Sequence, residues 1–168
     1  MIINRVWAMP NASTFQIKPI KELLERNVAG WPWVDPFARD SKWACISNDI
    51  NENFDTMFNR DALEFLQLLP SNYAVGVLFD PPYSLRQLKE CYDSIGVSMT
   101  QRESNQFWSD IKREIARVLK PGGVCISFGW NSGGIGKTLG FEIEEILLVP
   151  HGGPHNDTIC TLERKVIQ

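Results

Sequence analysis

The stretch YAVGVLFDPPY, residues 73–83, joins a continuous β-prone run to two consecutive prolines. An apolar run of this length without polar alternation is typical of a strand that is buried on both faces. The strand has to end at Asp80, because Pro81 and Pro82 cannot donate to a sheet ladder or continue a helix. The stretch therefore predicts a central strand followed by a fixed loop at one edge of a sheet.

Strand-like and helix-like segments alternate on both sides of this run, with no repeat, low-complexity tract or linker. Residues 1–18 are predicted to be irregular. Helices are predicted from Pro19 to Gly30, at 61–69, and from a Ser104 cap to about Leu119, and strands at 31–34, 43–47, 124–128, 141–149 and 158–164. The last two strands are predicted to form an antiparallel hairpin. This order of elements predicts an α/β sandwich with a mostly parallel sheet.

Length and composition are those of an ordinary globular protein. The 168 residues, 43% apolar and 22% charged, predict a single domain over 1–168. No apolar run approaches the roughly 20 residues that a membrane span needs, and the first residues do not resemble a secretion signal. The four cysteines form no C-x-x-C pair, which favours reduced thiols and a cytoplasmic location.

The charge balance limits the kind of nucleic-acid contact that the chain can make. The formal net charge is -3 and the pI is about 5.4, so the chain is not globally basic. Stable non-specific binding to nucleic acid rests on neutralisation of phosphates by Lys and Arg. Any nucleic acid would therefore be held by a local patch, which suits an enzyme better than a coating or architectural protein.

Residues 80–83 suit the methylation of an exocyclic amino group on a base. Such a nitrogen is a poor nucleophile, because its lone pair is delocalised into the ring, and it needs acceptors for both of its hydrogens. Asp80 offers a carboxylate, Pro81 offers a backbone carbonyl outside secondary structure, and Tyr83 offers an aromatic face for an extruded base. The alternative is a strand-ending Asp-Pro turn without a catalytic role.

These residues resemble the catalytic motif of the amino-group DNA methyltransferases, which make N6-methyladenine or N4-methylcytosine, in the Asp-first form that leans toward adenine. Other segments resemble that family's remaining motifs in the expected order, over about residues 14–128. They are 14–19 (TFQIKP), 34–38 (VDPFA), 47–49 (SND), 61–63 (DAL) and 120–123 (KPGG). The resemblance is to compact phage and prophage enzymes of a bacterial or phage-infected cell. It implies a Rossmann-like class I fold with a seven-stranded, mostly parallel sheet containing one antiparallel strand.

The resemblance also implies S-adenosylmethionine (AdoMet) as cofactor and a set of site residues. Catalytic roles fall on Asp80, Pro81, Pro82 and Tyr83. Cofactor contacts fall on Phe15, Lys18, Pro19, Asp35, Pro36, Phe37, Ala38, Asp49, Asp61 and Ala62. The chain departs from the family where glycines are expected, because residues 39–42 read RDSK; glycine there normally allows close approach of the backbone to the ligand.

Further substrate contacts are predicted at Tyr83, Arg86 and Trp130. Arg86, with Lys89 and Arg102, either contacts phosphates or belongs to a solvated helix face. Trp130 lies in a glycine-rich loop, residues 129–140, that we expect to frame the target pocket; a packing role is equally compatible with its position. A phosphate-binding loop is rejected because the required glycine before Gly136 is absent. No metal is predicted, since glycines and a proline separate His151 from His155 and exclude a helical ligand pair.

We therefore predict AdoMet-dependent methylation of adenine N6 in DNA. No separate target-recognition domain fits in the chain, so specificity is expected to be short, relaxed or supplied by a partner subunit. The expected partner is DNA or RNA, with a homo-oligomer or a partner subunit as the possible assembly. Three rival hypotheses remain: the same chemistry on RNA, an inactive AdoMet-binding subunit of a methyltransferase complex, and an enzyme that consumes AdoMet by other chemistry.

Overall fold

The structure of the chain is a computed structural model that describes residues 1–166. Its strands form one sheet with the order β1-β6-β7-β5-β4-β2-β3. They are β1 (Ile2–Arg5), β2 (Trp33–Asp35), β3 (Ile46–Ser47), β4 (Ala74–Phe79), β5 (Leu119–Gly129), β6 (Phe141–Val149) and β7 (Thr158–Lys165). Only β7 runs antiparallel to its neighbours, β5 and β6, among the pairs within these residues. The predicted seven-stranded sheet with one antiparallel strand is confirmed.

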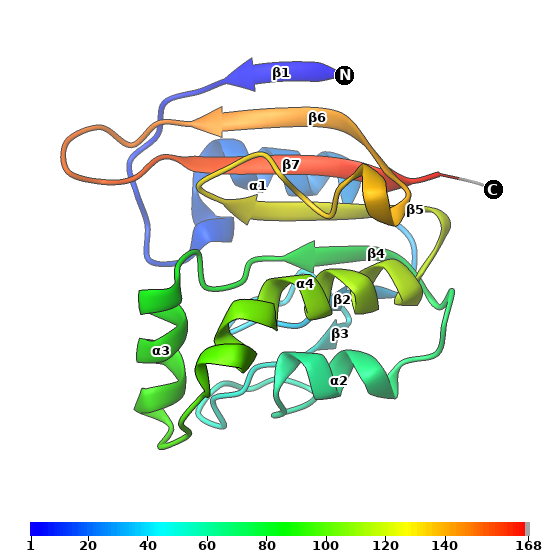
Figure 1. Ribbon diagram of the computed structural model, residues 1–168. Helices are drawn as coiled ribbons and strands as arrows, with labels where there is room; N and C mark the ends of the chain where they lie inside the picture. Colours follow the sequence, from blue (N-terminus) through cyan, green and yellow to red (C-terminus); the bar gives the residue numbers. More distant parts are fainter. Residues whose placement is uncertain (167–168) are drawn as a thin grey trace.

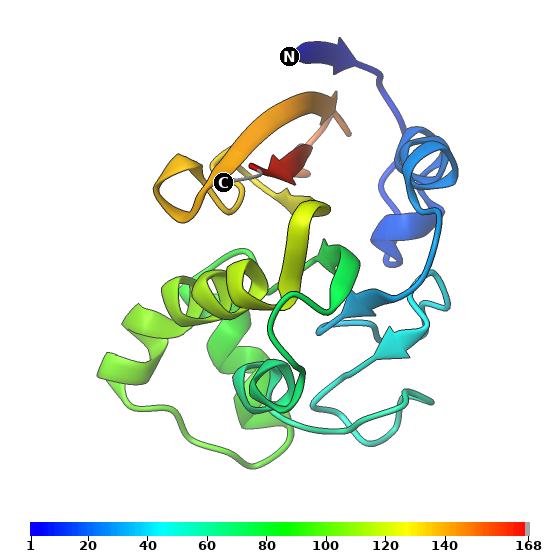
Figure 2. The same cartoon turned by 90° about the vertical axis from the view of Figure 1, so that its right-hand side faces the viewer.

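Helices cover both faces of the sheet (Figures 1 and 2). They are α1 (Lys18–Asn27), α2 (Ala62–Leu68), α3 (Leu85–Ser94) and α4 (Gln101–Val118), with short 3-10 helices at Thr14–Gln16 and Lys137–Leu139. α1 packs on one face, while α2, α3 and α4 pack on the other, so each face has its own hydrophobic core. Within residues 1–166, no helix is both long and apolar enough to cross a bilayer.

β4 lies between β5 and β2 and contributes to both cores. Val77 and Phe79 pack into the core under α2 and α4, whereas Leu78 packs into the core under α1. All three side chains are almost completely buried. This two-sided burial explains why the sequence of the strand is a continuous apolar run without alternation.

The N-terminal prediction was wrong, because residues 2–5 are not irregular. β1 pairs parallel with β6 and forms one edge of the sheet, where all four of its residues are exposed. A strand exposed on both faces has no apolar alternation, so its pairing comes from backbone hydrogen bonds that a sequence pattern does not reveal. α3, for which no helix was predicted, directly follows the loop at residues 80–84.

Other boundaries differ by a few residues. α4 begins after Thr100, which forms a capping box with Glu103, so the predicted cap Ser104 is wrong. Ser104 is instead a buried first-turn residue whose hydroxyl donates to the Thr100 carbonyl. β3 contains only Ile46–Ser47, shorter than the predicted strand, whereas the predicted hairpin of β6 and β7 is confirmed.

Three acidic residues follow neighbouring parallel strands at the same edge of the sheet. Asp35 ends β2, Asp49 follows β3 and Asp80 follows β4. They lie close enough for the charges of Asp49 and Asp80 to act on Asp35. The carboxyl edge of an open α/β sheet is where ligands bind, so the fold concentrates these carboxylates at the expected place.

Candidate active site

The loop after β4 is held by a side chain from α4. The indole Nε1 of Trp108 donates a hydrogen bond of 3.0 Å to the carbonyl of Pro82. The neighbouring carbonyl of Pro81 accepts none of the hydrogen bonds found within residues 1–166. One of the two proline carbonyls is therefore fixed by the protein, and the other remains available as an acceptor.

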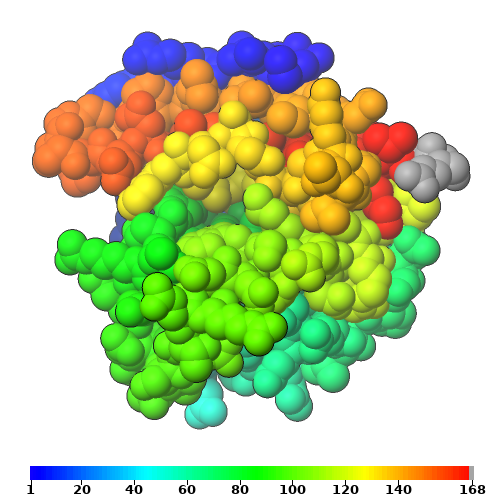
Figure 3. All heavy atoms as spheres, in the orientation of Figure 1, coloured from blue at the N-terminus to red at the C-terminus, as the bar shows by residue number. Residues whose placement is uncertain are grey.

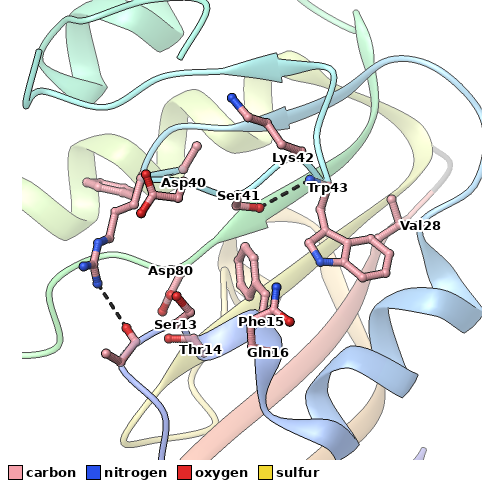
Figure 4. A pocket seen from close by; sticks show the side chains of 14 residues that line it. Ser13, Thr14, Phe15, Gln16, Val28, Asp40, Ser41, Lys42, Trp43 and Asp80 are labelled. Atoms are coloured by element: carbon pink, nitrogen blue, oxygen red, sulfur yellow. Dashed lines mark hydrogen bonds between the residues drawn. The ribbon is translucent and has the colours of Figure 1, made fainter. Parts of the chain in front are cut away.

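Asp80 is the first residue of this loop and is only partly exposed. The hydroxyl of Tyr83 donates to its Oδ1 over 2.5 Å, and Thr14 provides a second hydroxyl. Figure 4 shows Thr14 and Asp80 side by side in the hollow. Burial raises the pKa of Asp80, and the two hydroxyl bonds and the charge of Arg39 offset only part of this effect. The carboxylate is therefore oriented by neighbours and sensitive to pH.

Tyr83 forms the boundary between two hollows. Its ring meets Trp130 edge to face, with centroids 5.8 Å apart and an interplanar angle of 73°. Both rings line a small hollow of about 70 Å³, together with Trp108 and the start of the glycine-rich loop. Trp130 is 41% exposed, so its position is open to a ligand as well as packed against Tyr83.

The glycine-rich loop, residues 129–140, is fixed by a buried carboxylate on β7. Glu163 accepts hydrogen bonds from the backbone N–H of Ile135 and Gly136, at 2.5 and 3.0 Å. A Cβ at Gly134 would lie 2.1 Å from the carboxylate, so only glycine fits there. Figure 3 shows the loop (yellow) on the same face of the molecule as α3 and α4 (green).

Arg86 lies outside the hollows that contain Asp80. It is exposed on α3 and pairs with Glu90 one turn further along, at 2.8 Å. Its neighbour Lys89 is also exposed. This position is that of a solvated helix face, and a role in contacting phosphates stays a prediction.

Two adjoining hollows of about 490 and 310 Å³ meet at Asp80. Both are lined by Thr14, Phe37, Arg39 and Asp80, so the two hollows adjoin at the carboxyl edge of the sheet, and together they are called the channel below. Their combined size is within the range of small-molecule sites. Of the residues predicted to contact the cofactor, those that line the channel are Phe15, Phe37, Ala38 and Asp49.

The other predicted cofactor residues do not line this channel. Asp35, Pro36 and Ala62 are buried beneath it, and Lys18 and Pro19 begin α1, with Lys18 exposed to solvent. Asp61 borders a separate hollow of about 950 Å³ next to it. There its carboxylate caps α2 by accepting from Leu63 and Glu64 N–H, and it accepts the hydroxyl of Tyr92.

Asp35 and Asp49 organise the loops that form the channel. Asp35 accepts the N–H of Phe37, and its other carboxylate oxygen is buried without a partner among the described residues. Asp49 accepts the N–H groups of Arg39 and Asn51, at 3.0 and 2.9 Å. Burial raises the pKa of both carboxyls, that of Asp35 most strongly. Since each carboxylate oxygen has two lone pairs, Asp49 keeps capacity to accept from a ligand hydroxyl.

Several lining residues carried no predicted site role. They are Thr14, Arg39, Asn51, Phe54, Cys91 and Trp108. Thr14 lies inside a motif segment and Arg39 directly follows one, so their positions beside the motifs could have predicted that they line the site. Trp108 comes from a helix far along the chain, and no sequence pattern connects it to the catalytic loop.

His151 is part of the packing at the end of the hairpin. Its ring nitrogens lie 2.8 Å from the carbonyl of Ala8 and 2.8 Å from the hydroxyl of Thr158. It therefore links the N-terminal segment to the start of β7, and it lines neither hollow of the channel.

Comparison by sequence gives no match to a family model or to a curated protein. Comparison of the structure gives several. TrmN from Thermus thermophilus aligns with a TM-score of 0.58 and 17% identity, covering 89% of this chain and 49% of that one. A 1,6-didemethyltoxoflavin-N1-methyltransferase from Burkholderia thailandensis, with bound S-adenosylhomocysteine, has a TM-score of 0.58 and 11% identity over 89% of this chain and 78% of that one.

A SAM-dependent methyltransferase from Archaeoglobus fulgidus also aligns, with a TM-score of 0.56 and 12% identity over 88% of this chain and 94% of that one. The chain spans about half the length of TrmN and nearly the full length of the Archaeoglobus protein. At these identities the likeness concerns the fold. The chain therefore has the Rossmann-like fold of AdoMet-dependent methyltransferases, with its candidate catalytic loop at the ligand-binding edge of the sheet.

Proposed function

We propose that this protein transfers a methyl group from AdoMet to the N6 amino group of adenine in DNA. The observation that carries the proposal is the pairing of two acceptors at one place. The Asp80 carboxylate lies in the channel. Among residues 1–166, the neighbouring carbonyl of Pro81 has no hydrogen-bond donor, while that of Pro82 accepts from Trp108. Two acceptors are what an amino group with two hydrogens requires.

The chain supplies orientation and polarisation for this reaction. Asp80 and the Pro81 carbonyl accept the two amino hydrogens. This favours rehybridisation of the nitrogen, so that its lone pair projects out of the plane of the ring. Tyr83 and Trp130 form an aromatic corner beside the acceptors, where a flipped or unpaired base can stack. AdoMet supplies a methyl group on a sulfonium. In a direct transfer the N–C bond forms as the S–C bond breaks, S-adenosylhomocysteine leaves as the neutral thioether, and the methylated amino group loses one proton to water. No covalent enzyme intermediate is needed.

The residues of the channel fit AdoMet in size and chemistry. The channel continues from the loop at residues 37–43 to Asp49 and Asn51, past Asp80. Phe37 and Phe54 provide apolar surface for the nucleoside, and Asp49 provides an acceptor for ribose hydroxyls. The order of these groups along the channel would leave Asp80 near the reacting centre.

One assay separates this function from its rivals. Purified protein is incubated with AdoMet labelled in the methyl group and, in parallel, with duplex DNA, single-stranded DNA and RNA, and the product nucleosides are identified. Labelled N6-methyladenine from DNA is the expected result. Label in RNA alone would favour the RNA hypothesis, and AdoMet binding without any transfer would favour an inactive subunit. Labelled N4-methylcytosine would support the same mechanism but identify cytosine, not adenine, as the target base.

Methyl transfer is expected to fall as the pH is lowered through the raised pKa of Asp80. Protonation turns one Asp80 oxygen into a hydroxyl donor and removes the negative charge, and burial moves that loss above the ordinary pKa of about 3.9. Stability should change in the opposite sense. The stability linked to Asp35 and Asp80 is fully present below about pH 3.9, their unfolded pKa, and is lost as pH rises through the raised folded values.

These opposite trends are measured as kcat/KM and as the free energy of urea unfolding over the same pH series. The variant Asp80→Asn should lack the acid limb in whatever activity it retains. A wild-type rate that stays constant down to about pH 4 would contradict a raised pKa at the acceptor.

Trp108→Phe should slow the reaction without weakening cofactor binding. The variant keeps an aromatic side chain but loses the hydrogen bond to Pro82, which is worth about 1 kcal/mol. If that bond positions the loop, kcat should fall about three- to tenfold while the Kd for S-adenosylhomocysteine is unchanged. Trp31→Phe is the matched control, because Trp31 is 66% exposed and away from the channel. Equal kcat values for the two variants would exclude positioning by Trp108.

A further inference from the structure

Arg39 occupies a backbone conformation that favours glycine. Its φ is 46°, in the left-handed region, at the place where the resembled family has glycine. Its N–H donates to the buried carboxylate of Asp49, which fixes the turn. The chain therefore keeps the turn of the cofactor loop but places a long cationic side chain on it. An unfavourable backbone conformation retained at a ligand-binding loop points to a role for the side chain.

The Arg39 side chain reaches across the junction of the two hollows. Its Nη1 donates to the carbonyl of Ala12 over 3.1 Å, and its guanidinium carbon lies 5.5 Å from the ring centroid of Phe54. Arg39 lines both hollows, and its charge acts on Asp80 and Asp49. The bond to Ala12 uses one of five guanidinium N–H donors, so the other four can donate to a ligand anion.

The other candidate cations are less well placed. Lys42 lines one of the hollows, but its Nζ is 2.5 Å from the Asp55 carbonyl and 3.1 Å from the Asp55 carboxylate. Lys18, which the family resemblance favours, is exposed at the start of α1 and lines neither hollow. AdoMet has one permanent anion, the carboxylate of its amino-acid tail, and a planar guanidinium suits a carboxylate better than an ammonium does.

We propose that Arg39, rather than Lys18, binds the carboxylate of the amino-acid tail of AdoMet. This inference rests on the proposed function and deepens it, because it identifies the residue that recognises one end of the cofactor. In the resembled family, glycine at this turn lets the backbone approach the ligand closely. Here the Arg39 side chain, from the same turn, would contact the ligand through its charge instead.

Two ligands separate this contact from general effects on the channel. S-adenosylhomocysteine carries the amino-acid tail, whereas 5′-methylthioadenosine has the same nucleoside without it. Calorimetric titration of both is compared for wild type and Arg39→Asn, since asparagine tolerates the left-handed region without the charge. We expect Arg39→Asn to weaken S-adenosylhomocysteine about ten- to a hundredfold, the range for a lost bond to a charged group, and to leave 5′-methylthioadenosine within about threefold.

Conservative and rival variants complete the test. Arg39→Lys should recover part of the discrimination, while Lys18→Gln and Lys42→Gln should keep the wild-type ratio of the two affinities. If Arg39→Asn weakens the binding of both ligands equally, Arg39 does not bind the amino-acid tail. If Lys18→Gln or Lys42→Gln abolishes the difference between the two affinities, that lysine binds the tail, and the proposal for Arg39 is overturned while the proposed function stands. A wild-type protein that binds neither ligand would overturn the proposed function as well.

Discussion

Asp80→Ala is expected to slow methyl transfer by about 10²–10³ while leaving cofactor binding measurable. The variant removes one of the two proposed acceptors of the target amino group, and removal of a single preorganised group of this kind lowers kcat by about 10²–10³. It leaves the Pro81 carbonyl and the rest of the channel in place. Single-turnover transfer of labelled methyl groups to DNA measures the first effect, and titration with S-adenosylhomocysteine measures the second.

The isosteric variant Asp80→Asn makes this test sharper. Its amide keeps the shape of the side chain and one acceptor oxygen, but it loses the negative charge and replaces the other oxygen with an NH₂ donor, so its rate should fall less than that of Asp80→Ala. Asp93→Asn is the matched control, because Asp93 is an exposed acid on α3 that lines none of the hollows. If Asp80→Ala and Asp80→Asn both transfer methyl groups at a rate near that of Asp93→Asn, Asp80 is not an acceptor in the mechanism.

The sequence predicted β4 and its loop because the information there is local. A continuous apolar run followed by two prolines fixes both the burial of the strand and the residue at which it ends. The hairpin of β6 and β7 was predicted for a similar reason. The prediction failed for β1, since an edge strand exposed on both faces has no alternation, and for α3, where the sequence analysis placed no helix.

The sequence predicted which loops come together at the candidate site, but not which side chains contact one another there. Asp80, Phe37 and Asp49 lie along one channel because each follows a parallel strand of the same sheet. The bond from Trp108 to Pro82 joins residues 26 positions apart and depends on how α4 packs. Lys18, which was predicted to contact the cofactor, is exposed at the start of α1 and lines neither hollow, and its contact with the cofactor stays a prediction. Motif order thus predicts which loops meet, while packing decides which side chains enter the channel.

Gly76→Ala should be the most destabilising single methyl addition in the central strand. Gly76 on β4 is paired directly with Trp33 on β2, and a Cβ at Gly76 would lie 2.4 Å from three carbons of the indole. The indole cannot easily move, because it is 3% exposed and its Nε1 donates to the Ala29 carbonyl over 2.9 Å. Overpacking of this kind costs about 3 kcal/mol.

For a chain of this length, that loss corresponds to a Tm about 6–12 °C lower, measured by circular dichroism. Because β2 ends at Asp35 and leads into the loop that is proposed to bind the cofactor, the affinity for S-adenosylhomocysteine should fall along with stability. Gly129→Ala on the neighbouring β5 is the control: a Cβ there meets nothing within 4 Å, so its Tm should stay within about 2 °C of wild type. If both variants melt at the wild-type temperature, the contact between Gly76 and Trp33 does not constrain the sheet beneath the active site.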